Sequence, residues 1–267
     1  MRFMPIIQSK PPPPCQNKSS QACPANNAGG LARILRPCVK GILPSLDKPF
    51  VADVALAGLA SLAPEGIFGW LQEFWSANRE MPGFLRHRTV EAMISLSPGL
   101  TLPLARQRLF HENWHERYLA EHLFEAHAGL EDVPVLRAAL KEALQNDEEF
   151  CYRLCTLVDA FSHLPGAGSV PELSDVFAQF RYSYGRSRAA KAISVTSPDL
   201  FRERFALECM WDCEDRTRVL GAKFVPLSDK ASTGRLHDLA SNLWEEKEVR
   251  AEAGKRIADN QVMADGQ

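Results

Sequence analysis

Long apolar runs are missing from this chain of 267 residues, and so is an excess of charge of either sign. No uninterrupted apolar stretch approaches the ~18 residues of a membrane-spanning helix, so we expect no membrane association. The 31 basic and 33 acidic residues leave a net charge of -2, which gives no general attraction to nucleic acid. The apolar segment near the N-terminus is broken by Pro5 and is too short for a secretory signal, so we predict a cytoplasmic protein.

A disulfide framework is missing too. The chain has seven cysteines, an odd number for its length, and we expect them to be reduced. Cys151/Cys155 and Cys209/Cys213 are pairs four residues apart, and four thiolates would suit zinc if their helices adjoined. We favour core packing for these thiols, because buried Cys behaves as a small apolar residue.

No segment shows the alternation of a β-strand, whereas apolar residues recur at helical spacing, which predicts an all-α fold. Residues 1–30 are rich in Pro, Ser, Asn, Gln and Gly, with Pro11 to Pro14 consecutive, and are predicted to be a disordered tail. We assign residues 31–230 to a helical-repeat domain and residues 231–267 to a charged C-terminal helix or tail.

Prolines divide the helical region at regular intervals. Pro64, Pro98, Pro165 and Pro198 are predicted to end helices, with gaps of 34, 67 and 33 residues. The gap of 67 is close to two units, and a helix ending at Gly129 supplies the missing boundary. A unit of about 33 residues with two helices is typical of an α-solenoid, so we predict about five antiparallel helical pairs.

Local signals place individual helices within this scheme. Asn113 is a suitable N-cap for a helix over 114–128. Thr101 and Pro103 are predicted to open a helix over 104–110, and residues 200–213 are predicted to form one helix.

The segment 113–123 has an aromatic residue, Trp114, before Arg117, with Ala120 and Leu123 following at helical spacing. In this it resembles the inner-helix pattern of HEAT repeats, and segments 88–93 and 188–193 carry fainter versions. The resemblance covers about residues 50–225. The period also resembles that of TPR units, but the Trp-Leu-Gly-Tyr signature of that class is absent, so TPR is the second choice. Neither class has a fixed catalytic set, and the resemblance implies a surface for a protein partner.

One local match points to different chemistry. His111, Glu112 and His115 form an H-E-x-x-H pattern, in which two imidazoles on one helical face hold Zn²⁺ and the glutamate activates water. The alternative prediction is therefore a metal-dependent, hydrolase-type enzyme. A helix boundary at Asn113 would break the single face that this motif requires.

One basic stretch is concentrated enough to consider as a site for an anion or an acidic partner. It contains Arg181, Arg186, Arg188 and Lys191. Arg186 and Arg188 do not share a helical face, so the four cations cannot all converge, and we do not expect nucleic-acid binding. Our functional prediction is a non-enzymatic adaptor without a cofactor, which binds a protein partner on its concave face.

Overall fold

The computed structural model describes residues 64–145 and 151–265, and over these ranges it is all-helical, with thirteen α-helices, one 3-10 helix and no strand. The predicted tail over 1–30 and the helices predicted over 31–62 lie outside the described residues. The helices are α3 (Pro64–Ala77), α4 (Gly83–Ile94), α5 (Pro98–Arg108), α6 (Trp114–His127), η2 (Leu130–Asp132), α7 (Val133–Gln145), α8 (Cys151–Phe161), α9 (Pro171–Gln179), α10 (Ser183–Thr196), α11 (Pro198–Arg204), α12 (Ala206–Cys209), α13 (Asp215–Phe224), α14 (Lys230–Ser241) and α15 (Lys247–Asp265).

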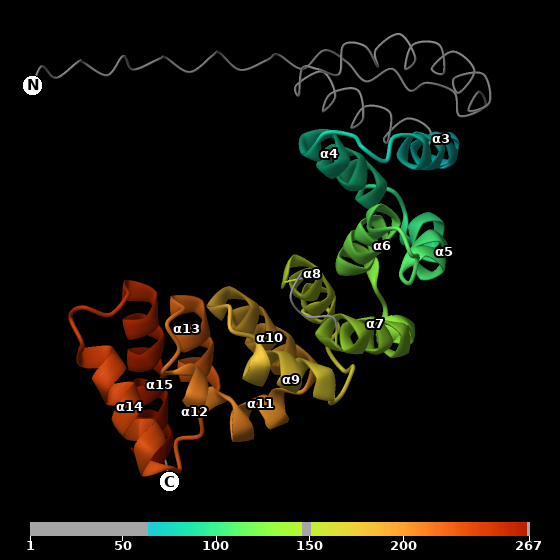
Figure 1. The fold of residues 1–267 in the computed structure, drawn as a ribbon. Coiled ribbons are helices and arrows are strands. Elements are labelled where there is room, and N and C mark those ends of the chain that lie inside the picture. The colour runs from blue at the N-terminus through green and yellow to red at the C-terminus, as the bar shows by residue number, and fades with distance from the viewer. Residues whose placement is uncertain (1–63, 146–150, 266–267) are drawn as a thin grey trace, which may run out of the picture.

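The helices lie in two layers that follow a curve (Figure 1). Helices α4, α6, α8, α10 and α13 lie on the inner side of the curve, and α3, α5, α7, α9 and α11 lie on its outer side. Each inner helix contacts the next inner helix along the chain, and the series continues from α13 to α15. We call α4, α6, α8, α10, α13 and α15 the inner helices. The connections within the pairs are short, so one outer helix runs back between two inner ones and successive inner helices share a direction.

Proline marks the starts of outer helices. Pro98, Pro171 and Pro198 each occupy the first helical turn, where the missing N–H costs no hydrogen bond. In the turn between α8 and α9, Gly166 and Gly168 adopt φ values of 85° and 76°, which side chains with a Cβ disfavour. These signals explain why the outer helices begin where they do.

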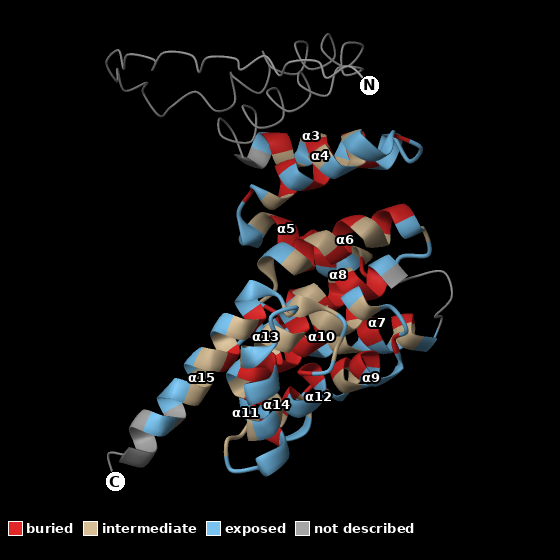
Figure 2. Ribbon diagram, turned by 90° about the vertical axis from the view of Figure 1, so that its left-hand side faces the viewer, coloured by how far each residue is buried: buried red, intermediate tan, exposed pale blue. Residues whose placement is uncertain are grey.

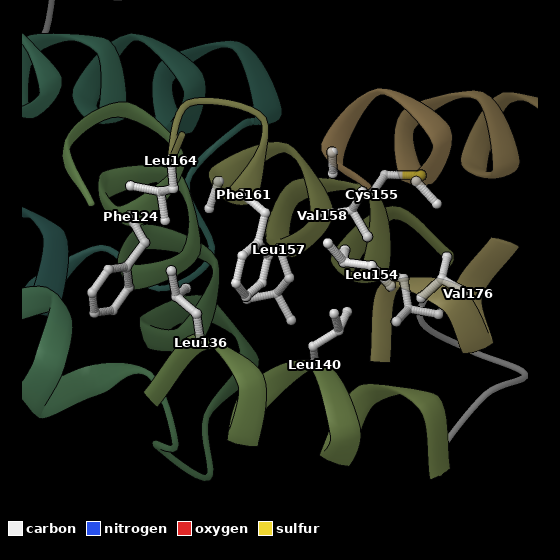
Figure 3. Packing of buried hydrophobic residues seen from close by; sticks show 14 of the residues in the cluster. Phe124, Leu136, Leu140, Leu154, Cys155, Leu157, Val158, Phe161, Leu164 and Val176 are labelled. Atoms are coloured by element: carbon white, nitrogen blue, oxygen red, sulfur yellow. The ribbon is translucent and has the colours of Figure 1, made fainter. Parts of the chain in front are cut away.

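Buried residues lie where neighbouring helices pack against one another, and exposed residues lie on the outward parts of the helices and in the turns (Figure 2). In the middle of the molecule, Phe124 from α6, Leu136 and Leu140 from α7, and Leu157 and Phe161 from α8 point toward one another (Figure 3), and none of them is exposed to solvent. Burying each such side chain stabilises the fold by about 1.5–3 kcal/mol. The buried residues of α7, which are Leu136, Ala139, Leu140 and Ala143, recur at helical spacing and so lie on one face.

Two predicted helices differ from those in the structure. Helix α5 starts at Pro98 rather than at 104, and Pro103 lies inside it. Pro103 is the sixth residue of α5, beyond the first turn, so its ring removes one hydrogen bond of the helix, the one to the carbonyl of Gly99. The single helix predicted over 200–213 is divided into α11 and α12 at Phe205.

The C-terminal part forms two helices that pack on α13. Helices α14 and α15 contact each other, and α15 contacts α13. Leu236 and Leu239 of α14 and Val249 and Ala253 of α15 are buried there. Within the described ranges, no helix is both long enough and apolar enough to cross a bilayer.

Candidate functional site

An open groove with a volume of about 1400 Å³ crosses the inner helices α6, α8 and α10. Each helix contributes residues four apart, which therefore lie on one face: Trp114 and Tyr118 from α6, Tyr152 and Thr156 from α8, and Tyr184 and Arg188 from α10. A second hollow of about 860 Å³ shares Tyr184 and Arg188 with the first and extends to α13. The groove therefore continues over four successive inner helices.

The floor of the groove holds an ion pair. Arg153 is 9% exposed, and its Nε donates to Glu121 Oε1 at 2.6 Å, while its Nη1 donates to Glu142 at 3.3 Å. Burial raises the pKa of Glu121, and the hydrogen bond and positive charge of Arg153 oppose this rise. The charge of Arg153 is therefore paired with carboxylates of the protein itself.

A second charged group, Arg188, is held in place beside the groove. Its guanidinium forms an ion pair with Asp159 of α8, donates to Tyr184 Oη at 2.6 Å and lies 4.4 Å from the centre of the Tyr184 ring. These contacts fix the position of the Tyr184 ring, because the cation and the aromatic face attract each other.

The groove also carries three exposed aromatic rings, one from each inner helix that it crosses. Trp114 is 50% exposed, Tyr152 is 81% exposed and Tyr184 is 41% exposed. Each of them is the first or second residue of its inner helix. Arg86 of α4 lies 4.5 Å from the centre of the Trp114 ring and supports it from one side.

Exposed aromatic side chains recur near the starts of the inner helices along the molecule. Over the described ranges, every exposed aromatic side chain lies within four residues of the start of an inner helix. These side chains are Phe84, Phe110, Trp114, Tyr152, Tyr182, Tyr184, Trp211 and Trp244. Because successive inner helices share a direction, their first turns lie along one edge of the molecule, and the aromatic side chains follow that edge.

The structure separates the two histidines of the H-E-x-x-H match. Helix α6 begins at Trp114, and the side chain of Asn113 caps it by accepting from the N–H of His115. His111 lies before the helix, exposed, and its Nδ1 accepts from the N–H of Asn113. The single helical face required for the zinc motif is therefore interrupted at Asn113.

His115 belongs to the core. It is 1% exposed, and its ring stacks on Trp75 of α3 with 3.9 Å between the ring centres. Its Nε2 lies 3.2 Å from the Trp75 carbonyl oxygen. Glu112 is exposed and lines the groove. Among the described residues, no group of three or more His, Cys, Asp or Glu side chains has the arrangement of a metal site.

The cations of the basic stretch point in different directions. Arg188 lines the groove, and Lys191 lines its extension toward α13. Arg186 instead pairs with Asp212, at 2.9 Å, in the turn before α13. Arg181 is exposed before the start of α10. The four do not form one anion site, although two of them border the groove.

The cysteine pairs are divided as well. Cys155 and Cys209 are buried, Cys213 is exposed, and none of the three is in a disulfide. Burial raises the pKa of Cys209. Cys155 lies on α8, whereas Cys209 lies on α12.

Comparison of the chain with protein-family models, with curated proteins and with solved structures gives no match.

Sequence patterns did not reveal the groove. They drew attention to Trp114 within a repeat pattern and to Arg188 within a basic stretch, but not to Tyr152 or Thr156. The signal that could have found them is an aromatic residue at the start of the second helix of successive units, with a polar residue four positions later.

Proposed function

We propose that the chain is a HEAT-like α-solenoid adaptor that binds an extended segment of a protein partner in the groove across α6, α8 and α10. The observation that carries this proposal is the groove itself, in which three successive inner helices each present an exposed aromatic ring. Rigid aromatic side chains in such a position are typical anchors of protein interfaces, because they bury a large area at low entropic cost.

The dimensions and polarity of the groove suit a polypeptide. Packed helices lie about 8–10 Å apart, so the path from α6 to α13 is about 27 Å long, and an extended chain of about eight residues would cover it. The groove also has donors for peptide carbonyl groups, since Trp114, with its indole N–H, and Tyr152, with its hydroxyl, line it. A segment lying across the helices would meet one aromatic ring per helix.

The charges favour a protein partner over nucleic acid. Within the groove, Arg153 and Arg188 are each paired with a carboxylate, and the net charge of the chain is -2. A backbone of phosphates needs several cations that are free to neutralise it. We further expect the adaptor to act in the cytoplasm and without a cofactor. The metal-dependent alternative receives no support from the geometry around Asn113, so we do not propose it.

The test is a selection of binding peptides from a random display library against the full chain, followed by affinity measurement with three variants. Tyr152→Ala and Trp114→Ala remove anchors of the groove, and each should weaken the selected peptides by at least about tenfold, the effect of losing about 1.4 kcal/mol. Trp244→Ala is the matched control, because Trp244 is 96% exposed and does not line the groove. Peptides that bind the Tyr152→Ala protein as well as the unchanged protein would contradict the proposal.

A further inference from the structure

The inner-helix groove has a candidate occupant in the chain itself. We infer that the proline run Pro11–Pro14 docks in the groove in cis, against Trp114, Tyr152 and Tyr184, and so competes with the partner. This inference rests on the proposed function, since it requires that the groove accept an extended segment.

The chemistry of the groove matches a proline run. Consecutive prolines favour the polyproline II conformation and are recognised by grooves lined with Trp and Tyr, where the rings of ligand and protein pack together. Proline has no backbone N–H, so such a run offers only carbonyl acceptors. The groove presents the complementary donors, the Trp114 indole N–H and the hydroxyl of Tyr152.

The length of the proline run also matches the spacing of the inner helices. Four residues of polyproline II extend about 12 Å, since each residue rises about 3.1 Å. This is slightly more than the 8–10 Å between adjacent packed helices. The run therefore reaches from the aromatic ring of one inner helix to that of the next, from Trp114 to Tyr152 or from Tyr152 to Tyr184.

Charge favours the N-terminal segment as the ligand. The first 46 residues contain six basic and no acidic residues, which leaves 25 basic and 33 acidic residues in the rest of the chain. The segment and the remainder therefore attract each other.

The chain between the proline run and α3 is long enough for the run to reach the groove. Pro64, where α3 begins, is fifty positions after Pro14. Even at the 1.5 Å rise of a helix this length spans about 75 Å. Helix α8 lies about 20 Å from α4, because two helix-to-helix spacings separate them. A tethered ligand at this range acts at an effective concentration of about a millimolar, so even weak docking would fill the groove.

The experiment measures fluorescence anisotropy of a labelled synthetic peptide that corresponds to residues 6–18, with Cys15 replaced by Ser. It is titrated with the unchanged full chain and with a full-length variant in which Pro11, Pro12, Pro13 and Pro14 are all replaced by Ala. The expected result is that the alanine variant binds the peptide at least about tenfold more tightly than the unchanged chain, because its groove is not occupied by its own prolines. Adding Tyr152→Ala to this variant should abolish the binding, and adding Trp244→Ala should leave it unchanged.

Two outcomes would overturn the inference. Equal binding of the peptide to both chains would mean that the tail does not occupy the groove in cis. Absence of binding to the alanine variant would mean that the groove does not take prolines. Repeating the display selection with the alanine variant separates this failure from failure of the adaptor proposal, because peptides that need Tyr152 would still be selected if only the proline inference were wrong.

Discussion

At the scale of single residues, His115 is a side chain whose protonation the fold controls directly. A carbonyl oxygen can only accept, so Nε2, which faces the Trp75 carbonyl, carries the proton, and Nδ1 is buried without a partner. Burial lowers the pKa of His115 below 6.5. The unfolded chain takes up its proton near pH 6.5 and the folded chain only at a lower pH. Stability conferred by neutral His115 is therefore present above pH 6.5 and is lost as the pH falls through this window.

The prediction concerns His115→Gln, which removes the titrating group. Urea unfolding of the unchanged chain should give a lower free energy of unfolding at pH 5.5 than at pH 7.5. His115 can contribute at most about 1.4 kcal/mol to this decrease for each pH unit in the window. The variant should lose less between the two pH values, although it is less stable at both. His237→Gln, at an exposed position, is the control and should keep the full acid sensitivity. An equal loss in His115→Gln would show that protonation of His115 is not resisted by the fold.

At the scale of the helix, Asn113 decides between two accounts of the same residues. As the N-cap of α6 its side chain accepts from the N–H of His115 at 2.9 Å, so Asn113→Ala should destabilise the protein by about 1 kcal/mol. Inside a continuous helix, as the zinc motif requires, the same change would be stabilising, because Ala has the higher helix propensity. The sign of the change in urea midpoint tells the two apart. Asn113→Asp, which also caps, should stay close to the unchanged protein.

A second prediction at this scale uses a close approach between helices. A Cβ on Gly221 of α13 would lie 2.7 Å from the Ala206 carbonyl oxygen and 2.8 Å from the Met210 nitrogen. These backbone atoms cannot move without shifting α12, so Gly221→Ala should destabilise the protein by about 1–3 kcal/mol. Gly234→Ala in α14 is the matched control, because nothing lies within 4 Å of its added Cβ. It should stabilise by about 0.5–1 kcal/mol, and thermal unfolding that gave both variants the same sign would refute the contact.

Sequence patterns predicted the helices better than the site. The cap at Asn113 follows from a local rule about hydrogen bonding at the start of a helix, and the structure contains it. The start of α5 was missed because a proline inside a helix looks the same in sequence as one at its first turn. The groove was missed for a different reason. Tyr152 and Tyr184 are neighbours only because α8 and α10 pack together, and no pattern within one helix encodes that contact.

At the scale of the whole molecule, each inner helix has its main inner-layer contacts with the helix before it and the one after it. If the chain is a solenoid, its stability is the sum of local interfaces rather than of one shared core. The stability of the first described pair, α3 and α4, then depends on contacts with few neighbouring helices. Trp75 of α3 is completely buried and stacks on His115 of α6, so it ties this pair to the rest of the stack.

Trp75→Ala is therefore predicted to loosen one end of the molecule without affecting the other. Truncating a buried Trp costs about 3–5 kcal/mol, and in a stack of local interfaces this cost falls on the nearest units. Native-state hydrogen exchange followed by mass spectrometry should show amides of α3 and α4 exchanging at least about 100-fold faster, while those of α14 and α15 keep their protection. Trp244→Ala, which removes an exposed ring, should change neither end. If exchange accelerated equally in α14 and α15, the helices would unfold as one cooperative unit, and the solenoid that the adaptor proposal assumes would be wrong.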